Sequence, residues 1–128
     1  MIGIEFKKSN EHDNFLNYLF ENIDLNDYEI DITEDEMYYD NQNIHFDKLY
    51  NEGKFKSGIY VIFINLKIYP KNNTNYENIK TYEDFINSSC QLMVLINDSV
   101  YVEIYFKDKL LKNKILSNVC KKRIKYDV

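Results

Sequence analysis

The chain has 128 residues, a formal net charge of −5, and a composition of 45% hydrophobic and 29% charged residues. This length and composition are typical of one globular domain with its own core, so we expect a single domain over residues 1–128 rather than a disordered chain. Ala and Trp are absent, and Asn, Ile, Lys and Tyr are in excess. This bias follows A/T-rich codons, so the number of tyrosines alone does not indicate a binding surface.

The sequence has no feature of a membrane or secreted protein. Its longest apolar run, Ile59 to Leu66, is far shorter than the ~20 residues that cross a bilayer, and the first residues lack the apolar core of a secretory signal. Two cysteines occur, Cys90 and Cys120, and both are expected to be reduced structural thiols. We therefore expect a cytoplasmic protein that does not bind a membrane.

The first part of the chain predicts two strands separated by a helix. Residues 2–6 alternate apolar and polar side chains, which is the period of a half-buried strand. Ser9 or Asn10 can cap a helix that runs to about Asn22 and has acidic residues in its first turn. Residues 28–33 alternate again and predict the second strand.

The middle of the chain predicts the central strand of a sheet. Residues 37–39 extend the second strand, and residues 46–50 predict one helical turn that ends near Gly53. A strand then runs from Gly58 to Tyr69 and ends at Pro70, which cannot donate to a ladder. It is apolar on both sides over half its length, as central strands are. One face carries Tyr60, Ile62, Ile64, Leu66 and Ile68, and the other carries Ile59, Val61 and Phe63.

The segment Ile79 to Asp108 predicts a capped helix followed by a β-hairpin. Thr81 and Asp84 have the spacing of a capping box, and the short helix after them faces inward with Tyr82, Phe85 and Ile86. An odd-length loop at residues 97–99 places the apolar residues of both hairpin strands on one face, whereas a two-residue loop mixes apolar and polar rows. That apolar face carries Leu92, Val94, Ile96, Val100, Val102 and Ile104.

The last helix begins after Asp108 and ends in a basic turn at residues 121–123, so both ends complement the helix dipole. Its inward stripe consists of Leu111, Ile115, Leu116, Val119 and Cys120. The predicted order is β-α-β-(β)-β-α-β-β-α. Because hairpins are present and strands do not alternate strictly with long helices, we expect an α+β domain in which helices pack on a mostly antiparallel sheet.

Several segments are similar to a known family. They are Ile79 to Asp108, the preceding NLKIYP at residues 65–70, and the opening GIEF followed by NEHDNFL. In these segments the chain resembles an uncharacterised family of small proteins from low-GC Gram-positive bacteria, defined as a domain of unknown function. The resemblance is weakest between Asp35 and Phe55. It implies a bacterial cytoplasmic origin and no catalytic residues, supports the predicted fold, and leaves the function open.

No pattern of residues predicts a catalytic, cofactor or metal site. The acidic segment Asp24 to Asp40 lacks the Gly and the final Glu of a calcium loop, and its alternation indicates a solvated strand face or a docking surface. Cys90 and Cys120 have no base placed beside them by sequence, and neither the two cysteines nor the two histidines, His12 and His45, have chelating spacing. Glycine-rich phosphate loops are also missing. We therefore assign no catalytic residue, no metal and no cofactor.

The charge is unevenly distributed along the chain. Residues 1–64 hold fourteen acidic and five basic residues, net −9, and residues 65–128 hold seven and eleven, net +4. The basic block at residues 107–125 is almost entirely Lys, whereas nucleic-acid binding favours Arg and a basic domain, and the pI here is about 5.0. We expect no nucleic-acid partner. Blocks of opposite sign can neutralise each other or steer a charged partner.

One face of the hairpin is the candidate interaction site. It carries four apolar or aromatic side chains, Met93, Leu95, Tyr101 and Tyr105. If all helices cover one face of the sheet, these side chains and Ile59, Val61 and Phe63 remain partly exposed on the other face. If the first and last helices flank opposite faces, the same side chains belong to the core.

The leading hypothesis is a non-enzymatic protein-interaction module that binds a protein partner or a second copy of itself. One alternative is a small enzyme or ligand-binding protein with a pocket between helices and sheet. Such a pocket would bring Cys90, a histidine and carboxylates together. Another alternative is a toxin-neutralising immunity protein, which the small size and the acidic segment allow.

Overall fold

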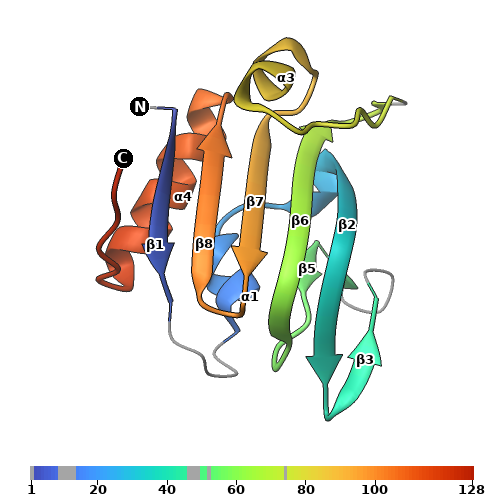
Figure 1. Cartoon of the computed structure of the whole chain (residues 1–128), viewed down its shortest axis with the longest axis vertical. Coiled ribbons are helices and arrows are strands. Elements are labelled where there is room, and N and C mark those ends of the chain that lie inside the picture. The colour runs from blue at the N-terminus through green and yellow to red at the C-terminus, as the bar shows by residue number, and fades with distance from the viewer. Residues whose placement is uncertain (1, 9–13, 46–49, 52, 74) are drawn as a thin grey trace.

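The computed structural model describes the chain except for residues 1, 9–13, 46–49, 52 and 74 (Figure 1). The strands are β1 (Gly3–Lys7), β2 (Tyr28–Tyr39), β3 (Gln42–Ile44), β4 (Tyr50–Asn51), β5 (Lys54–Phe55), β6 (Tyr60–Pro70), β7 (Leu92–Asn97) and β8 (Tyr101–Phe106). The helices are α1 (Phe15–Leu19), the 3-10 turn η1 (Leu25–Asp27), α3 (Tyr82–Asn87) and α4 (Lys109–Lys121).

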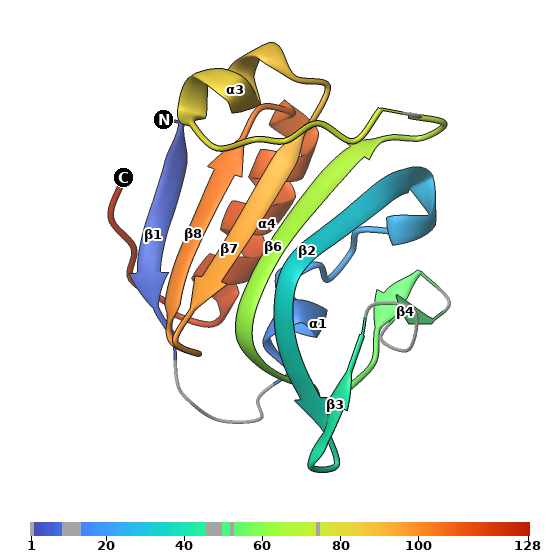
Figure 2. The same ribbon diagram turned by 45° about the vertical axis from the view of Figure 1, so that its right-hand side comes forward.

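Six of the strands form one antiparallel sheet in the order β1-β8-β7-β6-β2-β3, and β4 and β5 form a separate small hairpin. The predicted α+β class and the antiparallel sheet are confirmed. β6 lies between β2 and β7, as expected for a strand that is apolar on both sides (Figure 2). The sheet extends to an edge strand at each end, β1 and β3.

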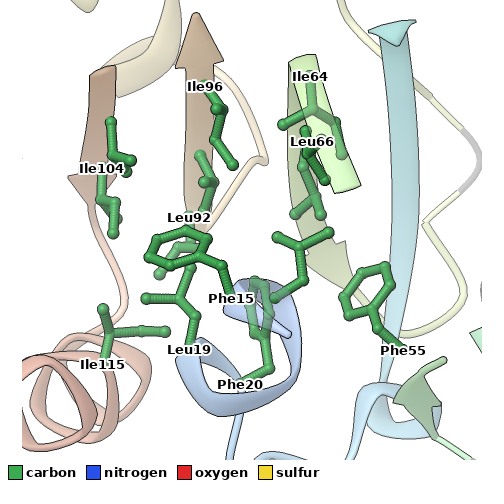
Figure 3. Close-up of a cluster of buried hydrophobic side chains, with 14 of the residues drawn as sticks. Phe15, Leu19, Phe20, Phe55, Ile64, Leu66, Leu92, Ile96, Ile104 and Ile115 are labelled. Atoms are coloured by element: carbon green, nitrogen blue, oxygen red, sulfur yellow. The ribbon is translucent and has the colours of Figure 1, made fainter. Parts of the chain in front are cut away.

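The main core lies on one face of the sheet, and both α1 and α4 pack on that face (Figure 3). The two helices are joined by Asn118, a buried residue of α4 whose amide Nδ2 donates to the carbonyl oxygens of Leu19 (2.8 Å) and Glu21 (2.9 Å). Those carbonyls belong to the end of α1 and the turn after it, where intrahelical donors are lacking. Residues from both helices and from the strands of the sheet then fill the core, among them Phe15, Leu19, Phe20, Ile64, Leu66, Leu92, Ile96, Ile104 and Ile115.

The alternation of apolar residues predicted the wrong face for the residues at the start of β6. Ile59 and Val61 belong to the main core together with Ile64, Leu66 and Ile68. The alternation of β6 therefore changes phase between Val61 and Ile64. This change of phase lies where the pairing register between β6 and β2 shifts, opposite the β2 residues Thr33 to Met37. A β-bulge of this kind is not visible in the apolar pattern of a single strand. Of the three residues expected on the other face, only Phe63 lies there.

The hairpin loop has the expected odd length but a different position. Asn97 pairs with Tyr101, so the loop comprises residues 98–100 rather than 97–99, and the apolar rows still share a face as predicted. Positive φ angles at Asp98 (50°) and Ser99 (69°) make the turn possible.

The helices differ from prediction in length and in some inward positions. The described part of α1 ends at Leu19 rather than Asn22, and its predicted start lies outside the described residues, as does most of the turn expected at residues 46–50. The Thr81–Asp84 capping box and the Asp108 cap are present. Three residues expected to face inward are instead exposed, because they lie on the solvent side of their short or terminal turns: Tyr82, Ile86 and Cys120.

Truncation of a β6 side chain tests the assigned core. Ile64 is 3% exposed and belongs to the main core, so Ile64→Ala should lower the free energy of unfolding by ~2–5 kcal/mol, as cavity-forming substitutions do. Ile86→Ala is the matched control, because Ile86 is 43% exposed on α3 and its loss should cost about 0.5 kcal/mol or less. Urea unfolding followed by circular dichroism measures both. Equal losses would contradict the assigned faces.

Candidate functional site

The face of the sheet opposite α1 and α4 is hereafter called the open face. Because side chains alternate along a strand, the neighbours of the core residues point to it. The register makes two cross-strand rows across its centre. One row is Glu5, Glu103, Leu95, Asn65 and Thr33, and the other is Gly3, Tyr105, Met93, Lys67 and Asp31. The first and last helices therefore do not flank opposite faces.

One end of the open face is covered by α3 and the segment before it. A second buried cluster forms there, made of Tyr69, Ile79, Phe85, Cys90 and Met93. The ring of Phe85 lies 6.4 Å from that of Tyr105, and the ring of Tyr76 meets Tyr69 edge to face at 5.3 Å. In Figure 1, α3 caps the ends of the strands and leaves most of the sheet uncovered.

The four predicted interaction residues share this face but differ in exposure. Tyr101 is 48% exposed, and Leu95 and Tyr105 are half-buried against the second cluster. Met93 is only 7% exposed and belongs to that cluster, so its expected partial exposure was wrong. The apolar pattern of the hairpin did not predict this, since the position of α3 over Met93 depends on contacts between segments that are distant in sequence.

Lys107 fixes α3 to the end of β8. Its Nζ donates to the carbonyl oxygens of Phe85 (2.9 Å), Ile86 (3.3 Å) and Ser88, all at the C-terminal end of α3. A cation at this end of a helix also opposes the negative end of the helix dipole. Burial lowers the pKa of the Lys107 ammonium, which also lies 5.2 Å from the centre of the Phe85 ring. The sequence alone assigned Lys107 only to a basic block.

The role of Lys107 can be tested by removing its donors. Lys107→Met keeps the aliphatic stem but leaves the three carbonyls without this cation, and should lower the free energy of unfolding by ~1–3 kcal/mol. Lys109→Met is the control, because Lys109 is exposed in the first turn of α4. Chemical denaturation of the two variants measures the difference. If both variants lose the same stability, Lys107 is not the anchor of α3.

A group of polar side chains lies beneath the surface of the open face. Lys67 is buried, donates to Thr33 Oγ1 at 3.4 Å, and lies 3.9 Å from Asp31 Oδ2. Among the described residues, the buried Asn65 Oδ1 has no hydrogen-bond partner. Burial, and secondarily the nearby Cys90, raises the pKa of Tyr69 to about 12, so its phenol is protonated at neutral pH. Lys67 and Asp31 place opposite charges next to each other below the surface, and the protonated Tyr69 phenol is not a reactive nucleophile.

The cysteines and histidine do not form a catalytic group within the described chain. Burial raises the pKa of the Cys90 thiol to about 11, and its Sγ donates to the carbonyl of Leu92 at 3.3 Å. The imidazole of His45 is exposed and lies 3.3 Å from Asp35 Oδ2, and His12 lies outside the described residues. Where the structure describes the chain, no group of three or more His, Cys, Asp or Glu side chains could hold a metal ion.

Thiol reactivity provides a test of this arrangement. At pH 8 a thiol with a pKa of about 11 is ionised to about one part in a thousand, and only the thiolate attacks disulfide reagents. Cys120 is exposed, so the native protein should react promptly at one cysteine and at Cys90 only after unfolding. Titration with a chromogenic disulfide reagent, with and without denaturant, counts the two classes. Two prompt thiols in the native protein would contradict the buried Cys90.

A groove of about 680 Å³ lies on the other side of the molecule, between α1 and the β4-β5 hairpin. Its walls combine buried apolar side chains such as Phe20 and Phe55 with polar side chains such as Asn17, whose Nδ2 donates to Ser57 Oγ at 3.1 Å. Its volume suits a small molecule. Neither Cys90 nor His45 lines it, so it does not contain the residues expected of an enzyme pocket.

A second groove, of about 430 Å³, lies at the β1 end of the open face and is lined by Glu5, Lys7, Tyr101, Glu103 and Lys125, among others. The ammonium of Lys7 lies 5.2 Å from the centre of the Tyr101 ring. The backbone of Asp127 pairs with that of Glu5 through two hydrogen bonds of 2.9 Å. This end of the face therefore brings together charged and aromatic side chains from both termini.

The fold and the open face define a two-layer α+β domain with its main core on one side of the sheet. No described helix has the length and apolar content needed to span a membrane. The chain belongs to the family described as Protein of unknown function (DUF2691), whose model matches residues 1–127. It is similar to Uncharacterized protein YncE of Bacillus subtilis (strain 168), with 27% identity over 128 residues that cover 91% of this chain and 82% of the relative. No solved structure matches the chain. The resemblance inferred from the sequence is confirmed, and the family assigns no activity.

Proposed function

We propose that the protein is an interaction module that binds a protein partner through the open face. The observation that carries the proposal is the placement of both α1 and α4 on the opposite face, which leaves this side covered only at the end where α3 lies. A sheet with one face in water usually carries polar side chains on that face. Here the open face also carries Phe63, Leu95, Tyr101 and Tyr105, which the fold does not need for its main core.

The exposed aromatic residues support a protein interface. Phe63 and Tyr101 are 37% and 48% exposed on the sheet, and Tyr82 and Tyr76 are exposed on the α3 side of the same face. Tyrosines bury a large area with little loss of side-chain entropy and are enriched among residues that dominate binding energy. The protein is proposed to act in the cytoplasm, because Cys90 and Cys120 are both free thiols.

The proposal predicts the effect of charges placed on the exposed part of the face. Tyr101→Asp combined with Phe63→Asp should abolish partner capture or self-association, because both side chains are exposed and their change leaves the buried clusters intact. Leu95 is avoided, because it packs against the second cluster and its replacement by Asp would also test folding. The control is Leu110→Asp, since Leu110 is 58% exposed on α4.

Light scattering measures self-association, and pull-down from a bacterial host followed by reconstitution with the purified captured protein measures partner binding. Circular dichroism should be unchanged in all variants. The expected result is loss of binding in the Tyr101→Asp/Phe63→Asp protein and retention in Leu110→Asp. Equal binding by both, or a monomer that retains no purified partner, would overturn the proposal.

A further inference from the structure

We propose that the open face recognises a basic segment of a different protein, whose Lys or Arg side chain binds between the carboxylates of Glu5 and Glu103 and the rings of Tyr101 and Tyr105. This inference rests on the proposed function and specifies the chemistry of the partner.

The sheet register places the two glutamates directly beside each other. Glu5 lies directly opposite Glu103 in the β1–β8 ladder. The backbone N–H and C=O of Glu5 both bond to Asp127, so they point away from β8 and the pair with Glu103 is of the non-hydrogen-bonded type. In that type the side chains are nearest to each other, with Cα atoms about 4.5 Å apart. Like charges placed opposite each other destabilise a sheet, so this pair should lower the free energy of unfolding. A contribution to stability therefore does not account for the pair.

Among the described residues, no ion pair within 4.0 Å involves Glu5 or Glu103, although Lys7 and Lys125 line the same groove. The ion pairs within 4.0 Å among the described residues are Lys67–Asp31, Lys71–Glu29 and His45–Asp35. The nearest basic residue on β1, Lys7, is opposite Tyr101 and lies over its ring. Glu103 accepts one long hydrogen bond of 3.5 Å from the Tyr105 hydroxyl. Both carboxylates therefore keep the capacity to accept hydrogen bonds from an incoming cation.

The aromatic side chains beside the pair suit the same ligand group. Tyr101 and Tyr105 precede and follow Glu103 by two residues on β8, so all three side chains share the face. A guanidinium pairs with carboxylates and stacks on aromatic rings, and an ammonium binds over their faces. Burial, and then the charges of Glu103 and Glu5, raise the pKa of Tyr105, which indicates that the negative potential of both glutamates extends over this ring.

The lack of a side chain at Gly3 leaves room for the ring of Tyr105 on the opposite strand. A Cβ at Gly3 would lie 2.6 Å from the carbonyl oxygen of Ile104 and 3.0 Å from Cδ1 of Tyr105. Any other residue would displace the ring or the strand, because contacts of 2.6 Å are not tolerated between these atoms. The second groove, of about 430 Å³, opens beside the glutamates and Tyr101 and has room for a long basic side chain. The net charge of −5 would attract a basic partner from a distance.

The test uses a defined probe, the peptide acetyl-Leu-Arg-Leu-Arg-amide, and its analogue in which citrulline replaces both arginines. Titration into the ¹⁵N-labelled full chain should shift the amides of residues 3–7 and 101–105 with the arginine peptide and not with the citrulline peptide. Glu5→Gln/Glu103→Gln should weaken the arginine peptide at least fivefold, because it removes both carboxylates but keeps their shape.

The matched control is Glu34→Gln/Asp40→Asn, which removes the same charge at two exposed residues of the β2–β3 region and should change the affinity less than twofold. The thermal midpoint of Glu5→Gln/Glu103→Gln should be equal to or higher than that of the unchanged protein, because like-charge repulsion is removed. Equal weakening in the two double variants, or shifts centred on the acidic strand β2, would overturn the inference.

The outcome also separates this inference from the proposed function. If Glu5→Gln/Glu103→Gln binds the purified partner normally while Tyr101→Asp/Phe63→Asp does not, the interface is real and the basic-side-chain assignment is wrong. If neither variant affects binding, both proposals fail. Concentration-dependent dimers that the Gln variant abolishes would overturn the assignment to a different protein and indicate a second copy, through its own basic residues at 121–125.

Discussion

The two hydrogen bonds of the Asn118 amide to the carbonyls of Leu19 and Glu21 hold α1 against α4, and the arrangement of the whole domain depends on this contact. Leaving this buried amide without partners would cost ~1–3 kcal/mol, so the two hydrogen bonds favour this relative position of the helices. With both helices on one side, β1, β8, β7 and β6 must direct one apolar row each to that side. The open face is largely uncovered because both helices lie on the other side of the sheet.

The second cluster is small because α3 has only six residues and is anchored mainly through Lys107. It buries Met93 and part of Tyr105 but cannot reach Tyr101 or Phe63. The boundary between covered and uncovered sheet therefore falls across the hairpin β7–β8. The groove beside α1 is separate from this boundary, since its walls come from α1, the turn after it and the β4-β5 hairpin.

Much of the fold was predictable, because local signals and the final structure agree in the second half of the chain. The Thr81 capping box, the Asp108 cap, the end of β6 at Pro70 and the pairing of apolar rows in β7 and β8 each depend on residues close in sequence. The phase change in β6 was not predictable, because it arises from a bulge against β2. The burial of Met93 and the cross-strand position of Glu5 opposite Glu103 likewise depend on contacts between distant segments.

The pairing of Asp127 with Glu5 affects how the sheet behaves in a crowded solution. An edge strand with free backbone groups is a template on which other chains can add strands, and proteins commonly block such edges. Asp127 occupies the middle of β1, where its N–H and C=O groups use both outward bonds of Glu5. At the opposite edge, β3 pairs with only three residues of β2, Met37 to Tyr39, and the remaining edge of β2 carries acidic side chains, which disfavour the addition of another strand. The domain thus exposes a side-chain surface while a backbone pairing covers the middle of one edge strand, and charged side chains mark the other edge.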